Sequence, residues 1–436
     1  IKGIFNFDIF WRYTMVKIKE LSNGIRVVME NLPYVRSISF GIYVKNGSSC
    51  ESEDFEGISH FIEHMLFKGT EKRSAKQIAE DMDELGGQIN AYTTKEYTCY
   101  HTRTLDTHFD KALDILGDMF LNPKFDENDV KKERNVIIEE INMYDDDPEE
   151  LVQDIIQGIT LKGTRLSHPI LGTAEKISAF NSEIIKNYFK ENYGNDKTVI
   201  SVVGNFEPDI MLEKLEKTFG AKAETESKSA ESLDISGYSQ AVMAKEKDTE
   251  QLHICIAFPG YKREDVMKYP YTIMNTVFGG GMSSMLFQKI REEKGLSYSI
   301  YSFPMAFEST GLFIIYTALN PSQAKDMCIA LKECIKDLKT NGISEELLRK
   351  TKTQLISNFI IGNESTLNRM TSNGVSFLMN GFVKPQEEII KEAEEVTLNS
   401  VIEAANYVFD MEKASIAAAG NISGVDFNEM LGILKE

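Results

Sequence analysis

The chain has 436 residues, too many for one typical hydrophobic core, so we expect two domains. Hydrophobic residues make up 42% of the sequence, and no apolar run reaches the roughly twenty residues that a membrane helix needs. The net charge of −19 argues against nucleic acid and anionic membranes as partners. Five cysteines, with no C-x-x-C pair among them, predict reduced core residues of a cytoplasmic protein.

Residues 1–14 differ from the rest of the chain. They lack an initiator methionine and include Trp11, the only tryptophan, whereas Met15 reads as a natural start. They also lack the basic region and the cleavage site of a signal peptide. We therefore expect a non-core extension. A second interpretation is that this aromatic-rich segment occupies a peptide cleft.

The first regular elements predicted are β-strands, over residues 24–30 and 37–45. In the second of them, every other residue is apolar, which predicts a strand with one buried face. Its buried residues would be Ile38, Phe40, Ile42 and Val44.

Residues 57–70 carry the sequence His60-Phe-Ile-Glu63-His64 on a predicted helix that ends near Gly69. His60 and His64 are four residues apart, so both imidazoles project from one face and can bind one metal ion. Glu63 is close enough to that face to reach a water molecule at the metal. H-x-x-E-H is the inverse of the commoner zinc-protease order H-E-x-x-H. The spacing therefore predicts a metal centre, against the alternative of two unrelated histidines that share a helix.

Ser74 and Gln77 form a capping box that opens the next helix, which we expect to end at Gly86. Residues 88–101 then alternate as in a β-hairpin that turns near Thr94 and Lys95.

A third metal ligand is expected from the strongly helical segment 133–144. Glu133 and Glu140 are seven residues apart and fall on its inward, apolar face, where a carboxylate usually has a partner. Either could complete the site. The alternative for Glu133 is an ion pair with a basic neighbour.

Three features indicate two similar domains. Residues 198–204 read as a buried strand, and residues 415–421 repeat its Gly-Asn ending about half a chain later. Between them, residues 221–240 are polar and read as a linker. The expected division is therefore a first domain over residues 15–220, a linker over residues 221–240 and a second domain over residues 241–436.

The glycine-rich run 278–284 lacks the Lys-Ser/Thr ending of a phosphate-binding loop, which argues against nucleotide binding.

From Met15 onward the chain resembles the pitrilysin-type zinc peptidases, or inverzincins. It is most similar to two-domain members such as bacterial processing proteases and the mitochondrial processing peptidase. In this family a glutamate about seventy-six residues beyond the second histidine completes the zinc site, which implies Glu140. The preceding glutamate, here Glu133, supports catalysis. The resemblance implies an α+β fold with two similar domains, each an antiparallel sheet backed by helices. Only the first domain would hold metal.

The resemblance also implies substrate-binding residues. The first strand of the hairpin would be an exposed edge to which a peptide adds as a further strand, with Asn90 and Ala91 at the binding positions. Arg291 and Tyr298 match a pair that polarises the scissile carbonyl in the family. Met285 stands where relatives commonly have arginine, so a charge contact from that position is not expected.

The sequence thus predicts a zinc endopeptidase with one Zn²⁺ per chain, bound by His60, His64 and Glu140, and with Glu63 as general base. Its substrates would be extended peptides or unfolded segments held in an enclosed chamber. In a two-domain chain the resemblance implies a homodimer in which Arg291 and Tyr298 serve the partner's zinc. The alternatives are a non-catalytic core or assembly subunit and one half of a heterodimeric peptidase.

Overall fold

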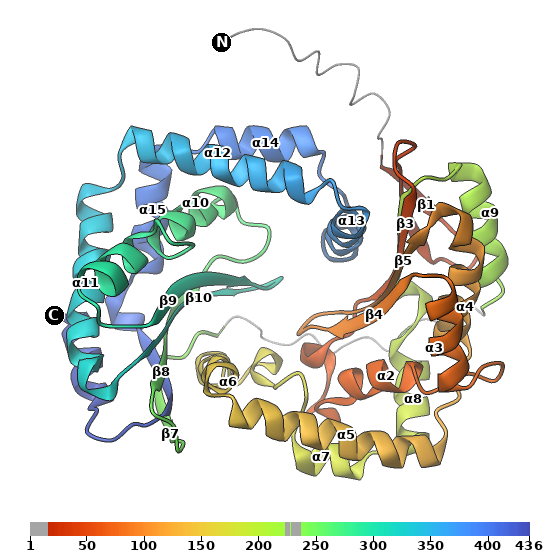
Figure 1. Cartoon of the computed structure of the whole chain (residues 1–436), viewed down its shortest axis with the longest axis horizontal. Coiled ribbons are helices and arrows are strands. Elements are labelled where there is room, and N and C mark those ends of the chain that lie inside the picture. The colour runs from red at the N-terminus through yellow and green to blue at the C-terminus, as the bar shows by residue number, and fades with distance from the viewer. Residues whose placement is uncertain (1–15, 223–226, 228–236) are drawn as a thin grey trace, which may run out of the picture. The chain divides into compact units, whose positions relative to one another are not determined.

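A computed structural model describes residues 16–222, 227 and 237–436 (Figure 1). The predicted extension 1–14 lies outside the described residues, as does most of the predicted linker 221–240. Among the described residues, no helix combines the length and the apolar character that crossing a membrane requires.

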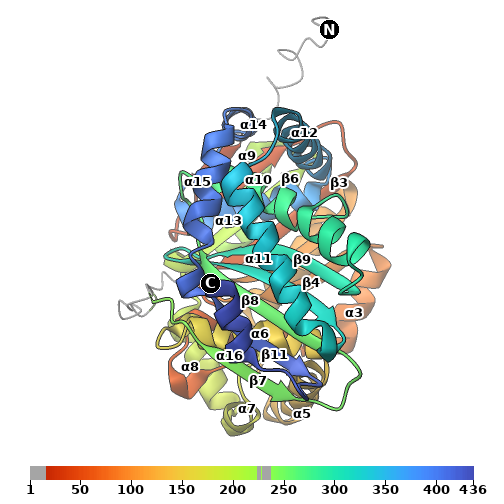
Figure 2. The same ribbon diagram turned by 90° about the vertical axis from the view of Figure 1, so that its left-hand side faces the viewer.

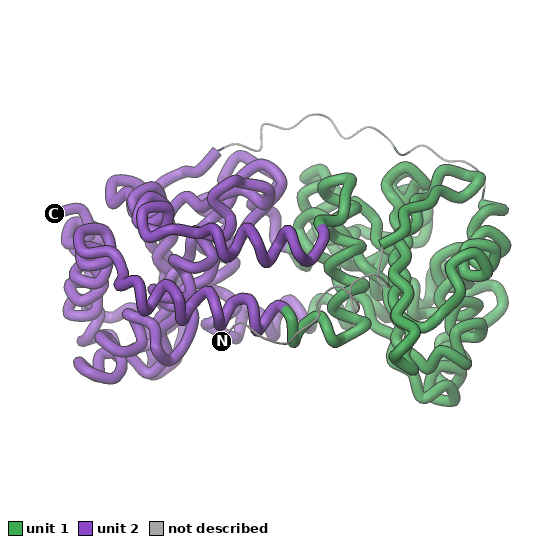
Figure 3. The backbone as a smooth tube through the Cα atoms, turned by 90° about the horizontal axis from the view of Figure 1, so that it is seen from above, with its two compact units in different colours: residues 1–139, 170–231, 360–384 green, residues 140–169, 232–359, 385–436 purple. Residues whose placement is uncertain are grey.

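The chain forms two compact units, each assembled from separate stretches of sequence (Figure 3). Unit 1 comprises residues 1–139, 170–231 and 360–384, and unit 2 comprises residues 140–169, 232–359 and 385–436. This division differs from the continuous domains 15–220 and 241–436 that the sequence indicates. Two segments, 140–169 and 360–384, belong to the unit formed mainly by the other half of the chain.

Unit 1 contains a six-stranded sheet in the order β1-β2-β6-β3-β5-β4. Neighbouring strands are antiparallel except β2 and β6, which run parallel, so the sheet is mixed and not purely antiparallel as expected. The strands are β1 (Lys17–Glu20), β2 (Arg26–Asn31), β3 (Ser37–Val44), β4 (Gln88–Thr93), β5 (Thr98–Leu105) and β6 (Thr198–Gly204). The helices of unit 1 are α2 (Ile58–Leu66), α3 (Ala75–Glu84), α4 (Phe109–Leu121), α5 (Glu127–Asp146), α7 (Ala174–Ala179), α8 (Ser182–Asn192), α9 (Pro208–Phe219) and α13 (Thr366–Asn380), with the last turns of α5 assigned to unit 2.

Both faces of β3 are buried, whereas the sequence predicted one. Phe40 packs edge-on against Phe109 of α4, and this is the face that the sequence predicted. The opposite face is covered by α13, as Figure 1 shows: Ser39 donates a hydrogen bond of 3.0 Å to Thr366. The small residues on that face therefore face a packed helix and not solvent. At Gly41, an added Cβ would lie 2.9 Å from the sulfur of Met370.

Unit 2 contains a five-stranded sheet in the order β7-β11-β8-β10-β9. Its helices α11, α15 and α16 lie in front of the sheet in Figure 2, and α6 packs on the opposite face, where Val152 and Ile156 contact the cluster around Ala257 and Ala417. The strands are β7 (Val242–Glu246), β8 (Leu252–Gly260), β9 (Ser299–Ala306), β10 (Gly311–Leu319) and β11 (Ser415–Gly420). The helices are α6 (Pro148–Thr160), α10 (Lys268–Phe278), the π-helix η7 (Phe287–Glu293), α11 (Ala324–Asn341), α12 (Glu345–Gly362), α14 (Gln386–Glu394), α15 (Leu398–Val408) and α16 (Phe427–Lys435).

The two units repeat one topology. Without β1, the order of the first sheet corresponds strand for strand to that of the second, and the one parallel pair of each sheet occupies the same place. The fully buried β6 and β11 correspond in this match, which explains the similar sequences at residues 198–204 and 415–420. The predicted α+β fold of two similar domains is confirmed, with α6 and α13 each packed on the sheet of the unit formed by the other half of the chain.

Candidate metal centre

The helix α2 carries the H-x-x-E-H sequence and is almost entirely buried. It begins after Gly57, whose φ of +88° falls in the left-handed region that glycine adopts readily. The apolar residues Phe61, Ile62 and Met65 are fully buried and fix the rotation of the helix. The metal-binding face is thereby held at a defined angle to the sheet.

His60 and His64 direct the same ring atom towards one point. Their Nε2 atoms lie 3.2 Å apart. Two nitrogens bound to one tetrahedral zinc at 2.0–2.1 Å would lie about 3.3 Å apart, so the pair matches a shared zinc ion. Burial, with the adjacent His64, lowers the pKa of His60 to about 3, so its imidazole is neutral near pH 7. The neutral form is the one that binds a metal.

Glu140 completes the cluster. One ligand atom from each of His60, His64 and Glu140 lies within 4.8 Å of the other two. Glu140 is on α5, which continues unbroken from Glu127 to Asp146. The chemistry of the set, two imidazoles and one carboxylate, is that of catalytic zinc sites with a position left for water. Among the described residues, this is the one group of three or more such side chains that could hold a metal.

Glu133 is not part of this cluster but contacts one of its histidines. Its Oε1 is 2.8 Å from Nδ1 of His64, and its Oε2 is 2.6 Å from Nζ of Lys68. Burial alone would raise the pKa of Glu133, but the hydrogen bonds from His64 and Lys68 outweigh burial and lower it. Lys68 is therefore the basic neighbour that the sequence analysis considered for Glu133. The Glu133 carboxylate also orients His64. A partner of this kind fixes the ring and its tautomer, leaving Nε2 for the metal.

Glu63 is held by a residue that the sequence did not single out. The hydroxyl of Thr93 donates a hydrogen bond of 2.5 Å to Oε2 of Glu63. Thr93 is the last residue of β4, the strand at the edge of the first sheet. The hydrogen bond therefore connects the expected general base to the strand expected to bind substrate.

The hairpin β4–β5 turns between Thr93 and Thr98, as predicted. Among the described residues β4 pairs with β5 alone, so within that part of the chain its other edge has no strand partner. Asn90 is exposed, and its Oδ1 accepts a hydrogen bond of 2.9 Å from the backbone N–H of Ala91. Asn90 and Ala91 thus lie on an edge that an extended peptide can extend.

Arg291 and Tyr298 form a local pair in unit 2. The guanidinium of Arg291 lies 5.4 Å from the ring centre of Tyr298 and 4.5 Å from that of Phe287. Arg291 is on the π-helix η7, a distortion that often occurs at functional sites. Tyr298 is 74% exposed, directly before β9. Met285 packs partly buried against the core of unit 2, which suits its apolar side chain.

Two of the remaining histidines, His108 and His253, make hydrogen bonds away from the cluster. Nδ1 of His108 is 3.0 Å from the carbonyl oxygen of Leu85, and Nδ1 of His253 is 2.8 Å from the hydroxyl of Tyr316.

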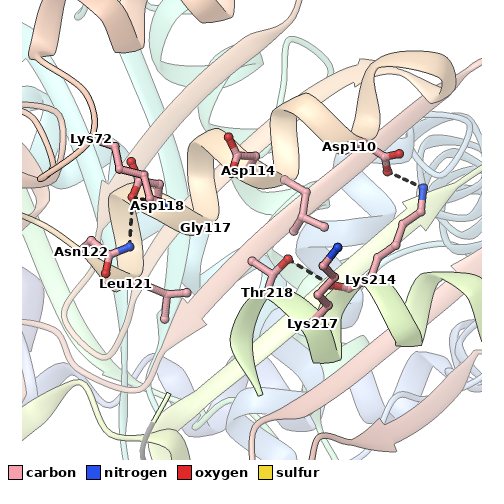
Figure 4. A pocket seen from close by; sticks show the side chains of 11 residues that line it. Lys72, Asp110, Asp114, Gly117, Asp118, Leu121, Asn122, Lys214, Lys217 and Thr218 are labelled. Atoms are coloured by element: carbon pink, nitrogen blue, oxygen red, sulfur yellow. Dashed lines mark hydrogen bonds and ion pairs between the residues drawn. The ribbon is translucent and has the colours of Figure 1, made fainter. Parts of the chain in front are cut away.

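A pocket of about 530 Å³ between α4 and α9 contains none of the candidate ligands (Figure 4). Asp110 on α4 pairs with Lys214 on α9, and Asn122 donates a hydrogen bond of 3.0 Å to Asp118. Its lining residues include no member of the His60, His64 and Glu140 cluster, the one candidate metal group among the described residues.

Sequence reasoning missed Thr93 and Lys68. Thr93 is thirty residues from Glu63, and only the folded hairpin brings the two together. Lys68 is four residues beyond His64, a spacing that places both on one side of a helical turn and could have suggested a shared partner.

Comparisons with known proteins place these features in context. The family described as Insulinase (Peptidase family M16) matches residues 26–174, and the one described as Peptidase M16 inactive domain matches residues 179–355. The chain is 40% identical over 410 residues to the uncharacterized zinc protease YmxG of Bacillus subtilis (strain 168), covering 94% of this chain and 100% of that protein. It is 35% identical over 393 residues to an uncharacterized zinc protease of Rickettsia felis, covering 90% and 94% of the two chains.

Two solved structures share the fold. A protease from Helicobacter pylori superposes with a TM-score of 0.87 at 19% identity, over 94% of this chain and 100% of that one. A peptidase M16 inactive domain from Pseudomonas fluorescens gives a TM-score of 0.86 at 18% identity, over 93% and 98%.

Proposed function

This chain belongs to peptidase family M16, the insulinase family, and is a zinc protease of that family. We propose that it is an endopeptidase whose metal centre is built from His60, His64 and Glu140. The observation that carries the proposal is the convergence of these three side chains, with the two Nε2 atoms spaced as on a single zinc ion. One ion per chain fits this donor set. Bound zinc supplies a Lewis acid that polarises a carbonyl group and lowers the pKa of water.

Glu63 is the general base in this mechanism. It takes a proton from the attacking water and passes it to the leaving amine of the cleaved peptide bond. The hydrogen bond from Thr93 fixes the position of Oε2 and with it the orientation of the carboxylate. Glu133 orients His64 through Nδ1 and takes no proton from substrate.

The substrate is an extended peptide or an unfolded protein segment that pairs with the free edge of β4. Backbone hydrogen bonds to Asn90 and Ala91 hold such a peptide without fixing its sequence. This binding mode is supported by the edge position of β4 and by the connection of its last residue to Glu63.

Arg291 and Tyr298 are placed by this proposal against the scissile carbonyl of a peptide at a second chain's metal centre. The exposure of Tyr298 and its contact with Arg291 support a role in contacting something outside unit 2. Two chains would then enclose a chamber, each contributing one catalytic centre and one arginine–tyrosine pair.

The role of Glu63 is tested by Glu63→Gln, with Glu53→Gln, an exposed residue before α2, as the matched control. We expect Glu63→Gln to bind zinc with unchanged stoichiometry while hydrolysis of a quenched fluorescent peptide library falls about 10²–10⁴-fold. The control should cleave like the unaltered protein. Retained turnover in Glu63→Gln would rule out its role as base. A zinc-loaded unaltered chain that cleaves nothing would instead favour a non-catalytic subunit.

The shared site is tested by mixing two inactive variants, Glu63→Gln and the double variant Arg291→Ala with Tyr298→Phe. Recovery of activity on mixing is expected, since one of the two mixed centres would contain every group. Native mass measurement must first show that the chains exchange. An exchanged but inactive mixture would mean that each chain works alone.

A further inference from the structure

The N-terminus of α2 lacks a local cap. Gly57, its N-cap residue, has no side chain, and the first turn contains no acidic residue. The backbone N–H of Gly57 instead donates a hydrogen bond of 2.7 Å to Oε2 of Glu51, and that of Ser59 donates one of 2.8 Å to Oε1. Both oxygens of one carboxyl group therefore satisfy donors that a helix leaves unpaired at its start.

Glu51 is 0% exposed. In the part of the chain that the structure describes, no lysine or arginine forms an ion pair with it, and burial raises its pKa to about 8. A buried carboxyl group without a cation costs stability relative to an apolar residue of similar size. Its presence at this point indicates a requirement that an apolar residue could not meet.

Ser59 is also held by a hydrogen bond to its side chain, in addition to the one made by its backbone N–H. Nδ2 of Asn46 donates a hydrogen bond of 2.9 Å to the Ser59 hydroxyl, and the Tyr188 hydroxyl donates one of 3.3 Å to Oδ1 of Asn46. The residue directly before His60 is therefore held by both its backbone and its side chain in a buried polar network.

The backbone on the other side of Gly57 leaves no room for adjustment. An added Cβ at Gly57 would lie 2.6 Å from the carbonyl oxygen of Leu171. The start of α2 is confined between this close contact and the two hydrogen bonds to Glu51. Loss of the hydrogen bonds to Glu51 would therefore remove one of the two constraints on the first turn of the helix, where His60 is the third residue.

We propose that Glu51 is a positioning residue of the metal centre: by binding the backbone of Gly57 and Ser59, it sets the direction of His60. It acts through Ser59 and makes no contact with the metal ligands. The inference rests on the proposed function, because it takes His60 as a zinc ligand. Partners outside the ligand set typically alter metal affinity 10–100-fold, and we expect an effect of that size.

The test is Glu51→Gln, which keeps the shape of the side chain but sets its NH₂ group against one of the two backbone N–H donors. The zinc dissociation constant, measured by competition with a chelator and without peptide, should rise 10–100-fold. The visible absorption of the Co²⁺-loaded chain should also change, because the ligand geometry changes. Glu30→Gln is the matched control, a buried carboxylate of unit 1 that binds Arg369 and Asn373. It should leave zinc affinity and the Co²⁺ spectrum unchanged even if stability falls.

Should Glu51→Gln fail to fold, Ser59→Ala removes the hydroxyl that bonds Asn46, Glu51 and Tyr188 but keeps the backbone N–H that bonds Glu51. It should weaken zinc binding several-fold. Unchanged zinc affinity in the folded variants would overturn the proposal. Equal weakening in Glu51→Gln and Glu30→Gln would overturn it too, because the effect would then be one of general stability. An unaltered chain that takes up no zinc would remove the metal centre of the proposed function, and this inference with it.

Discussion

The Thr93 hydroxyl on β4 donates a hydrogen bond of 2.5 Å to the Glu63 carboxylate on α2. The strand expected to pair with substrate and the expected base are thus joined by one side-chain contact. A peptide that extends the edge of β4 would meet a base already oriented by the same strand.

Thr93→Val removes the hydroxyl and keeps the shape of the side chain. Since a hydrogen bond to a charged group contributes about 1.5–3 kcal/mol, we expect kcat to fall at least roughly tenfold, with little change in KM. Thr93→Ser retains the donor and should recover most of the activity. Steady-state kinetics at full zinc occupancy measures both. Equal activity in the serine and valine variants would show that the hydroxyl does not matter.

Glu133→Gln tests the carboxylate that holds His64. The amide presents one acceptor where the carboxylate presents two, and it loses the charge that pairs with Lys68. Zinc affinity should fall about 10–100-fold in a chelator competition. Glu139→Gln, on the same helix but exposed, is the control and should bind zinc normally. A Glu133→Gln variant with full affinity would limit Glu133 to pairing with Lys68.

Arg369→Ala tests the attachment of α13 to unit 1. Arg369 forms an ion pair with the buried Glu30, which also accepts a hydrogen bond of 2.9 Å from Asn373. Removal of the arginine leaves Glu30 buried without its cation, at an expected cost of about 3–5 kcal/mol in urea unfolding. Lys76→Ala breaks the exposed pair with Glu80 and should change stability by less than about 1 kcal/mol. Similar losses of unfolding free energy in both variants would contradict the role of the Arg369–Glu30 ion pair in attaching α13 to unit 1.

His253 predicts a pH dependence of stability in the zinc-free chain. Burial lowers the pKa of His253, and Glu149 and Asp147 oppose this only in part. Below the unfolded pKa of about 6.5, the unfolded state binds a proton that the folded state does not, so stability falls as the pH falls. His253→Gln should therefore lose less stability than the unaltered chain between pH 7 and pH 5.5. Thermal unfolding in EDTA compares the two proteins. Parallel pH profiles would exclude this role for His253.

The parts of the site predicted from sequence are those that depend on short spacings. His60 and His64 share a face because they are four residues apart, and the hairpin from residue 88 follows from alternation over a few residues. Local patterns of this kind do not depend on the rest of the fold. The contacts of Glu63, Glu133 and Glu51 each join side chains or backbone brought together by tertiary structure.

The fold was predicted at the level of two similar α+β domains and not at the level of helix partners. An apolar stripe shows that a helix buries one face, but it does not show which sheet receives it. The sequence of α13 therefore could not reveal that it covers the Ser39 and Gly41 face of β3, and one face of that strand was predicted to be exposed. The parallel pairs β2–β6 and β7–β11 were missed because strand direction leaves little trace in composition.

The packing of α6 and α13 on the sheet of the unit formed by the other half of the chain has a consequence for synthesis on the ribosome. All six strands of the first sheet have been made once Gly204 is added, yet α13 begins only at Thr366. At 5–20 residues per second, one apolar face of that sheet stays uncovered for roughly 10–30 s. During this interval the nascent chain presents a surface that chaperones bind or that aggregates. A ribosome stalled between residues 204 and 366 would therefore carry a first unit that has all six strands of its sheet but lacks the helix that covers one face.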